Sequence, residues 1–242
     1  MLGKRLINTT SGGVVTCVDP FGDSSGLALY KLNGNANDES GNYDGTASNV
    51  TYGTGQFNQA GVFNGITSTI NTTYTPTVAN LRTVSLWFKG GTQSSFRKLL
   101  SVSPYGNSGR YDWARIGMLS NGTILGGYSA NNGGGVYELI SNSSYDDNNW
   151  HNVVLVLNGS YGTGSFVKMY IDDQEIIATP NTSFNTSLST IQGTFRLGHN
   201  LFGDTSLPGA VFNGSIDQVR VFDRELTAGE ITTLYTSDAS CG

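Results

Sequence analysis

Short apolar segments, separated by residues that favour turns, follow one another along most of this chain. Segments of this length and spacing predict β-strands. The predicted strands span residues 27–32, 60–64, 83–89, 98–103, 114–119, 123–128, 136–140, 150–158, 165–172, 175–178, 194–198 and 214–222.

Two of these segments show how the strands are buried. In TVSLWFK, residues 83–89, apolar side chains occupy every second position from Val84 onward, which is the alternation of a strand with one buried face. In HNVVLVLN, residues 151–158, both faces are apolar, so a central strand covered on both sides is predicted. Many such strands with almost no helix predict an all-β fold, a two-sheet antiparallel sandwich.

One short helix is predicted near the C-terminus. Thr227 precedes Glu230 by three residues, the spacing of a capping box. Ile231 and Leu234 then fall on one face and are expected to pack on the sandwich.

The chain is expected to form one domain with a short arm. Residues 1–25 are rich in Gly, Ser and Thr and show no periodicity, so an extended N-terminal arm is predicted there. Residues 26–242 are predicted to form a single β-sandwich domain, since all-β domains often reach this length.

Composition narrows the function classes. The net charge of -5 and the pI near 4.9 argue against nucleic acid as a partner, because phosphate binding requires clustered Lys and Arg. No segment approaches the roughly 20 consecutive apolar residues that cross a bilayer, so no membrane insertion is expected. A charged fraction of 13% with 33 Gly is typical of a turn-rich extracellular protein.

The N-terminal residues MLGKRLINTTSGGVV lack the apolar core of a signal peptide, which conflicts with an extracellular composition. A protein carried out of the cell within a bacteriophage virion resolves the conflict, and a trimmed signal is the alternative. The cysteines Cys17 and Cys241 bracket the predicted domain, and either a disulfide or two free buried thiols fits them. Sequons are frequent, but a chain rich in Asn, Ser and Thr produces them by chance.

The order of several segments resembles one known family. These segments are LALYKLNGNANDESGNYDGTASNVTYGTGQFNQAGVFNG, TVSLWFK, DDNNWHNVVLVLN, KMYIDDQEI, FRLGHN and FNGSIDQVRVFDRELTAGEI. Together they resemble the laminin-G-like and pentraxin-like domains of the concanavalin A-like lectin/glucanase superfamily. The resemblance implies a jelly-roll sandwich whose relatives bind sugars, proteins or calcium and occur in adhesins, enzyme-appended modules and phage virion proteins.

A structural calcium site is one implication. Asp217 shares strand parity with Val219 and Val221, so it is expected to face the core, where a carboxylate needs a partner. Asp38 and Asn42 supply the oxygen atoms that calcium prefers, and similar loops in the family lie close to the equivalent of the Asp217 strand. The alternative is that Asp38 and Asn42 form Asx-turns while Asp217 accepts backbone N–H bonds.

Catalysis is not expected. Asp173 and Glu175 approach the spacing of paired glycosidase carboxylates, but they stand in a predicted hairpin turn and the strand-borne Glu-Asp-Glu pattern of the glucanases is absent. His151 and His199 have no Cys or Ser motif nearby.

Aromatic residues suggest a different kind of site. Tyr105, Tyr111 and Trp113 cluster in a loop-rich segment, and Tyr128 and Tyr137 flank another. Such rings either cover the apolar faces of sugars or anchor loops and oligomer interfaces.

The favoured interpretation is a non-enzymatic virion surface protein, a capsid decoration or tail-fibre component. Its arm would bind other virion proteins and its sandwich, as part of a homo-oligomer, would face host-surface glycans. The alternative is a carbohydrate-binding lectin module of a bacterial secreted or cell-surface protein.

Overall fold

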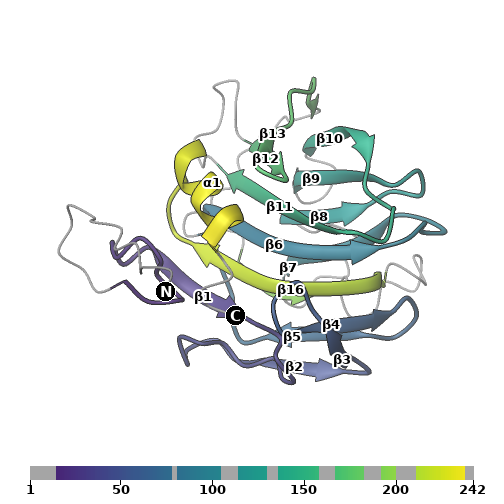
Figure 1. Cartoon of the computed structure of the whole chain (residues 1–242). Coiled ribbons are helices and arrows are strands. Elements are labelled where there is room, and N and C mark those ends of the chain that lie inside the picture. The colour runs from purple at the N-terminus through teal and green to yellow at the C-terminus, as the bar shows by residue number, and fades with distance from the viewer. Residues whose placement is uncertain are drawn as a thin grey trace, which may run out of the picture.

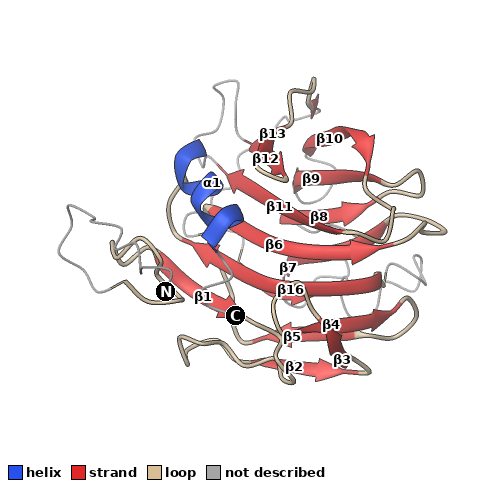
Figure 2. Cartoon of the chain, in the orientation of Figure 1, coloured by secondary structure: helices blue, strands red, loops and turns tan. Residues whose placement is uncertain are grey.

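Two antiparallel β-sheets face each other, and a helix lies against the outside of one of them (Figures 1 and 2). This computed structural model describes residues 15–77, 81–104, 114–129, 136–157, 167–182, 192–199 and 211–237. The predicted all-β sandwich with a short C-terminal helix is confirmed.

Sheet A contains strands in the order β13-β12-β11-β6-β16-β4-β3, and β1 also pairs with β16. The central strand β16 pairs with β6 along one edge and with β4 and then β1 along the other. The bounds are β1 Gly26–Tyr30, β3 Thr51–Thr54, β4 Gln59–Asn64, β6 Thr83–Gly90, β11 Trp150–Leu157, β12 Val167–Ile171, β13 Gln174–Glu175 and β16 Asn213–Phe222.

Sheet B contains strands in the order β14-β10-β9-β8-β7-β15-β5-β2. Neighbouring strands in this sheet are antiparallel throughout. The bounds are β2 Gly45–Ser48, β5 Thr69–Thr72, β7 Arg97–Pro104, β8 Ala114–Met118, β9 Thr123–Ser129, β10 Val136–Ser144, β14 Asn181–Thr182 and β15 Gly193–Leu197.

The apolar side chains form two layers. The larger layer fills the space between the sheets and includes alternate residues of β6, as the TVSLWFK pattern predicts. The smaller layer lies outside sheet A, where Val154 and Val156 pack with Ile231 and Leu234 of the helix. The strand β11 is therefore buried on both faces, as its sequence predicts.

A β-bulge in β16 changes which residues face the core. The register shifts between Asp217 and Arg220, and Gln218 has a φ of 48°. Asp217 pairs with Trp87 on the outer face of sheet A, whereas Val219 and Val221 point into the core. Asp217 is fully buried, but its predicted orientation toward the core is wrong because the extra bulge residue reverses the parity of the strand.

The helix α1, Ala228–Ser237, begins with the predicted capping box. The N–H of Thr227 donates to Glu230 Oε2 at 2.8 Å, and the N–H of Glu230 donates to Thr227 Oγ1 at 3.3 Å. Ile231 and Leu234 are buried against sheet A. Among the helices of the described residues, none is long and apolar enough to cross a membrane.

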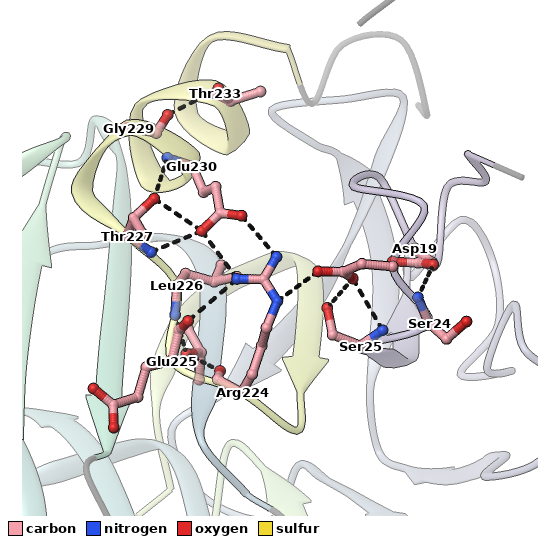
Figure 3. A network of polar contacts seen from close by, with 12 residues as sticks. Asp19, Ser24, Ser25, Arg224, Glu225, Leu226, Thr227, Gly229, Glu230 and Thr233 are labelled. Atoms are coloured by element: carbon pink, nitrogen blue, oxygen red, sulfur yellow. Dashed lines mark hydrogen bonds and ion pairs between the residues drawn. The ribbon is translucent and has the colours of Figure 1, made fainter. Parts of the chain in front are cut away.

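Residues 15–25 pack against the sandwich beside α1 (Figure 3). The ring of Phe21 lies 5.8 Å from that of Phe222, and the Arg224 guanidinium lies 5.3 Å from the Phe21 ring. Arg224 Nε donates to Asp23 Oδ2 at 2.6 Å, and Arg224 Nη2 donates to Glu230 Oε1 at 2.7 Å. The packed structure thus begins before residue 26, and residues 1–14 of the predicted arm lie outside the described residues.

The N-terminal segment is also held through Cys17. Its carbonyl oxygen accepts a hydrogen bond from the buried guanidinium of Arg220. Cys17 is disulfide-bonded, and the sequence contains one other cysteine, Cys241, which lies outside the described residues. Cys241 is therefore the one cysteine with which Cys17 can pair inside this chain, and the Cys17–Cys241 disulfide stays a prediction.

Candidate ligand-binding site

Polar residues form a continuous row across the outer face of sheet B. Directly paired residues on neighbouring strands point to the same face of a sheet. From β10 to β5 the row contains Glu138, Gly127, Arg115, Ser101, Arg196 and Asn71. The sequence neighbours of Arg115 and Arg196 belong to the core, so these arginines point away from it.

An ion pair at one end of the row fixes the position of Arg115. Arg115 Nε donates to Glu138 Oε1 at 2.6 Å, and Nη2 donates to the same oxygen. The side chain of Glu138 is 5% exposed and that of Arg115 is 18% exposed. Removing two charges from water is costly, so a buried pair of this kind depends on close geometry and orders both side chains.

A second arginine occupies the same row. Arg196 Nε donates to Asn71 Oδ1 at 2.9 Å. Arg115 and Arg196 both pair with Ser101, one from each side, which separates their Cα atoms by about 10 Å. Ser101 is short and fully buried, and its hydroxyl donates to the carbonyl oxygen of His199 at 2.8 Å. Two ordered guanidinium groups therefore stand on either side of a small residue.

A partly exposed aromatic ring lies beside Arg115. The Arg115 guanidinium carbon is 5.9 Å from the centroid of the Phe96 ring. A Cβ atom at Gly117 would lie 2.5 Å from Phe96 Cε2, so the glycine allows the ring to lie directly on the outer face of β8. Phe96 is half-buried, and an aromatic ring next to fixed polar groups suits the mixed surface of a sugar.

The residues of this site are absent from the sequence-based predictions. Their signal is a charged residue at an outward position within an otherwise apolar strand, as Arg115 shows in ARIGM and Glu138 in VYELI. Strand order brings these residues together, and strand order is not encoded in the local pattern.

The predicted aromatic residues fall into two groups. Tyr128 and Tyr137 are buried in the core between the sheets, so the sugar-facing interpretation is wrong for these two rings. They are cross-strand partners on the inner face of sheet B. Tyr105, Tyr111 and Trp113 lie outside the described residues.

Asp38, one of the predicted calcium ligands, organises its own loop. Its Oδ1 accepts hydrogen bonds from the N–H of Leu29 at 2.9 Å and of Ser40 at 3.1 Å, and its Oδ2 accepts one from the N–H of Tyr43 at 3.1 Å. Asn42 is exposed and contacts the Ser40 hydroxyl at 3.3 Å. These contacts match the alternative, in which Asp38 and Asn42 shape a turn.

The third predicted ligand, Asp217, has different partners. Its Oδ2 accepts a hydrogen bond from the N–H of Phe57 at 2.9 Å. Asp38 forms a bridge with Tyr30 of β1, and β1 lies between Asp38 and β16. Within the described ranges, no three His, Cys, Asp or Glu residues form a group that could hold a metal ion. Calcium binding by Asp38, Asn42 and Asp217 stays a prediction.

The candidate catalytic carboxylates have structural partners at the edge of sheet A. Asp173 lies in the β12–β13 turn with a φ of 68°, and its Oδ1 accepts a hydrogen bond from the Thr232 hydroxyl at 2.6 Å. Glu175 Oε2 accepts one from the Tyr170 hydroxyl at 3.1 Å. Asp173 thereby links the turn to α1, and Glu175 links β13 to β12.

His151 bridges two loops at the end of sheet A. Its Nδ1 lies 2.7 Å from Asp172 Oδ2 and its Nε2 lies 3.1 Å from Asp147 Oδ1. The hydrogen bond to Asp172 is the main reason that the pKa of His151 is raised above its usual value. A hydrogen bond from the backbone N–H of Asn149 is the main cause that lowers the pKa of Asp147 to about 2. The rings of Tyr145 and Phe88 lie beside the imidazole, with centroids 5.0 Å and 5.8 Å from it.

The pKa of His151 is expected to lie above 6.5 in an NMR titration of the imidazole. Only the imidazolium has two N–H groups and can donate to both carboxylates. Because the folded pKa is raised, this contribution to stability is complete below the unfolded pKa and is lost as pH rises through the folded pKa. Asp172→Asn should lower the His151 pKa. A titration midpoint at or below 6.5 in the unsubstituted protein would contradict the bridge.

Residues 63–232 match the concanavalin A-like lectin/glucanases superfamily. This match covers more than half of the chain. No curated protein sequence matches it.

Two solved structures illustrate how widely the fold is shared. The Trypanosoma rangeli sialidase in complex with the inhibitor DANA has a TM-score of 0.63 and 17% identity, over 90% of this chain and 34% of that chain. The botulinum neurotoxin serotype D binding domain has a TM-score of 0.61 and 16% identity, over 88% of this chain and 51% of that chain. The chain thus spans about a third of the sialidase, and at these identities the similarity establishes the fold alone.

Proposed function

Because the chain belongs to the concanavalin A-like lectin/glucanases superfamily, we propose that it is a carbohydrate-binding protein that acts by binding and not by catalysis. The outer face of sheet B is the proposed binding surface. The observation that carries this proposal is the polar row in which Glu138 orders Arg115 beside the half-buried ring of Phe96.

Saccharides require this combination of groups. Their hydroxyls need donors and acceptors held in fixed positions, and their C–H faces need an apolar surface. Arg115 and Arg196 are donors that Glu138 and Asn71 hold in place, so little side-chain entropy remains to be lost on binding. Phe96 supplies the apolar surface.

Binding without catalysis is supported by the positions of the carboxylates. Asp173 and Glu175 serve a hairpin turn of sheet A, and Glu138 is engaged with Arg115.

We further propose that the protein acts outside the cell, as a lectin module of a secreted or cell-surface protein. A virion location, attachment to other virion proteins through residues 1–14, and a homo-oligomeric state stay predictions from the sequence. Recovery of the chain with intact phage particles would support the virion location, and a glycan-binding sandwich is compatible with either setting.

Phe96→Ala is expected to weaken binding to a retained glycan by about two- to twelvefold, because the stacking of an aromatic ring contributes about 0.5–1.5 kcal/mol. A glycan array identifies the retained sugar, and isothermal titration calorimetry then measures its affinity. Phe57→Ala is the matched control, since Phe57 is also half-buried but packs on Trp87 outside sheet A. Retention of no glycan by the folded protein would overturn the proposed function.

A further inference from the structure

A second row of residues on the outer face of sheet B is apolar. Ile140 follows Glu138 by two residues on β10, and Gly117 follows Arg115 by two residues on β8. Leu125 of β9 pairs with both Ile140 and Gly117, and the register is unbroken from the polar row to these residues. Residues two apart on a strand point to one face, so this row faces the same way as the Glu138–Arg115 ion pair.

The side chains of this row lie outside the core. Leu125 is 8% exposed but belongs to neither apolar layer, whereas Ile124 lies between the sheets. The ring of Phe96 covers Gly117, where a Cβ atom would lie 2.5 Å from Phe96 Cε2. Ile140 is 37% exposed and is one of four exposed large apolar side chains among the residues that the structure describes. Phe96, Leu125 and Ile140 thus form an apolar strip across three strands.

The apolar strip extends beyond the area that one stacked sugar ring covers. Gly117, beneath the Phe96 ring, and Ile140 are two strands apart, about 10 Å at their Cα atoms. A sugar ring stacked on Phe96 would therefore direct its substituents toward Leu125 and Ile140. A hydroxyl placed there would lose its hydrogen bonds to water, whereas a methyl group would gain free energy by leaving water.

We propose that the ligand of this site is a saccharide with a methyl-bearing substituent, either an acetamido group or the methyl group of a deoxy sugar, and that Ile140 contacts this methyl group. The inference rests on the proposed carbohydrate-binding function. The polar row binds the hydroxyls of the same saccharide, and Arg115, 5.9 Å from the Phe96 centroid, joins the two rows. The contact with Ile140 depends on apolar surface alone and needs no free charge on the face.

The test compares six sugars attached to one linker: glucose and galactose, their 6-deoxy forms and their 2-acetamido forms. Surface plasmon resonance is expected to show at least about fourfold tighter binding of one methyl-bearing form than of its parent sugar, the factor for burying one carbon group. The 6-deoxy and 2-acetamido arms distinguish the two sources of the methyl group. The preference should persist from about 0.05 to about 0.5 M salt, because an apolar contact is not screened.

Variants assign the preference to Ile140. Ile140→Thr keeps a β-branched side chain that suits a strand but replaces a carbon group with a hydroxyl, so most of the preference should be lost. Ile140→Val keeps the apolar surface and should retain most of it. Ile66→Thr is the matched control, since Ile66 is 74% exposed in the loop between β4 and β5. Thermal unfolding of each variant verifies that it folds.

The outcomes separate this inference from the proposed function. Equal binding of parent and methyl-bearing sugars, or loss of the preference at high salt, would overturn the methyl-bearing ligand and leave carbohydrate binding intact. A preference that Ile66→Thr reduces as much as Ile140→Thr does would overturn the assignment to the apolar strip. Failure of all six sugars to bind would overturn this inference, and failure to retain any glycan of an array would overturn the proposed function as well.

Discussion

Glu138→Ala is expected to lower the free energy of unfolding by about 3 kcal/mol. The substitution leaves Arg115, whose side chain is 18% exposed, beside the outer face of sheet B without its carboxylate partner. Loss of one member of a buried pair is costly because the remaining charge stays desolvated. Urea denaturation monitored by intrinsic fluorescence measures the change.

A double-mutant cycle shows how much of that loss belongs to the pair. Arg115→Ala and the Glu138→Ala/Arg115→Ala double variant complete the cycle. The double variant is expected to be more stable than Glu138→Ala alone, because no unpaired charge remains. Additive effects of the two single substitutions would show that the ion pair contributes nothing.

Gly198→Ala is expected to destabilise the fold by about 3 kcal/mol or more. Gly198 has a φ of +77°, a conformation unfavourable for residues with a Cβ. The added Cβ would lie 2.1 Å from Cδ1 of Phe63, a buried core residue. Gly198 also links β15 to Leu99 and Phe212 through its backbone hydrogen bonds, so a shift there would disturb both contacts.

Gly229→Ala is expected to have the opposite effect on stability. Gly229 lies in α1, and a Cβ atom there meets nothing within 4 Å. Alanine should stabilise the helix by up to about 1 kcal/mol because it restricts the unfolded chain and favours helix. If thermal unfolding shows equal effects for Gly198→Ala and Gly229→Ala, the steric argument at Gly198 fails.

The sequence predicted the sandwich because most strands show their periodicity locally. The strong segments of β6, β11 and β16 and the capping box of α1 lie where the patterns indicate. The short strands β2, β3 and β5 were missed, since Thr, Asn and Gly dominate them and resemble turns. The strand predicted over residues 175–178 is the short strand β13, Gln174–Glu175, and one further backbone hydrogen bond joins the N–H of Ile176 to Met169 of β12.

The candidate site was harder to predict because it depends on strand order and on exact register. Asp217 illustrates the difficulty: one bulge residue, Gln218, moves the carboxylate to the other face of sheet A. Arg115 and Arg196 are distant in sequence and meet only because β8 and β15 both pair with β7. Neither the bulge nor the order of the strands can be read from the periodicity of the sequence.

The packing of residues 15–25 beside α1 has a mechanical consequence. Both described ends of the chain leave from the outer side of sheet A, away from the polar row on sheet B. Tension applied between these ends would first load the contacts of Arg224 with Asp23 and Glu230. The force would next reach the pairing of Gly26 in β1 with Phe222 in β16, which lies in sheet A. Sheet B lies outside this path, so it could keep the proposed ligand while the protein is pulled.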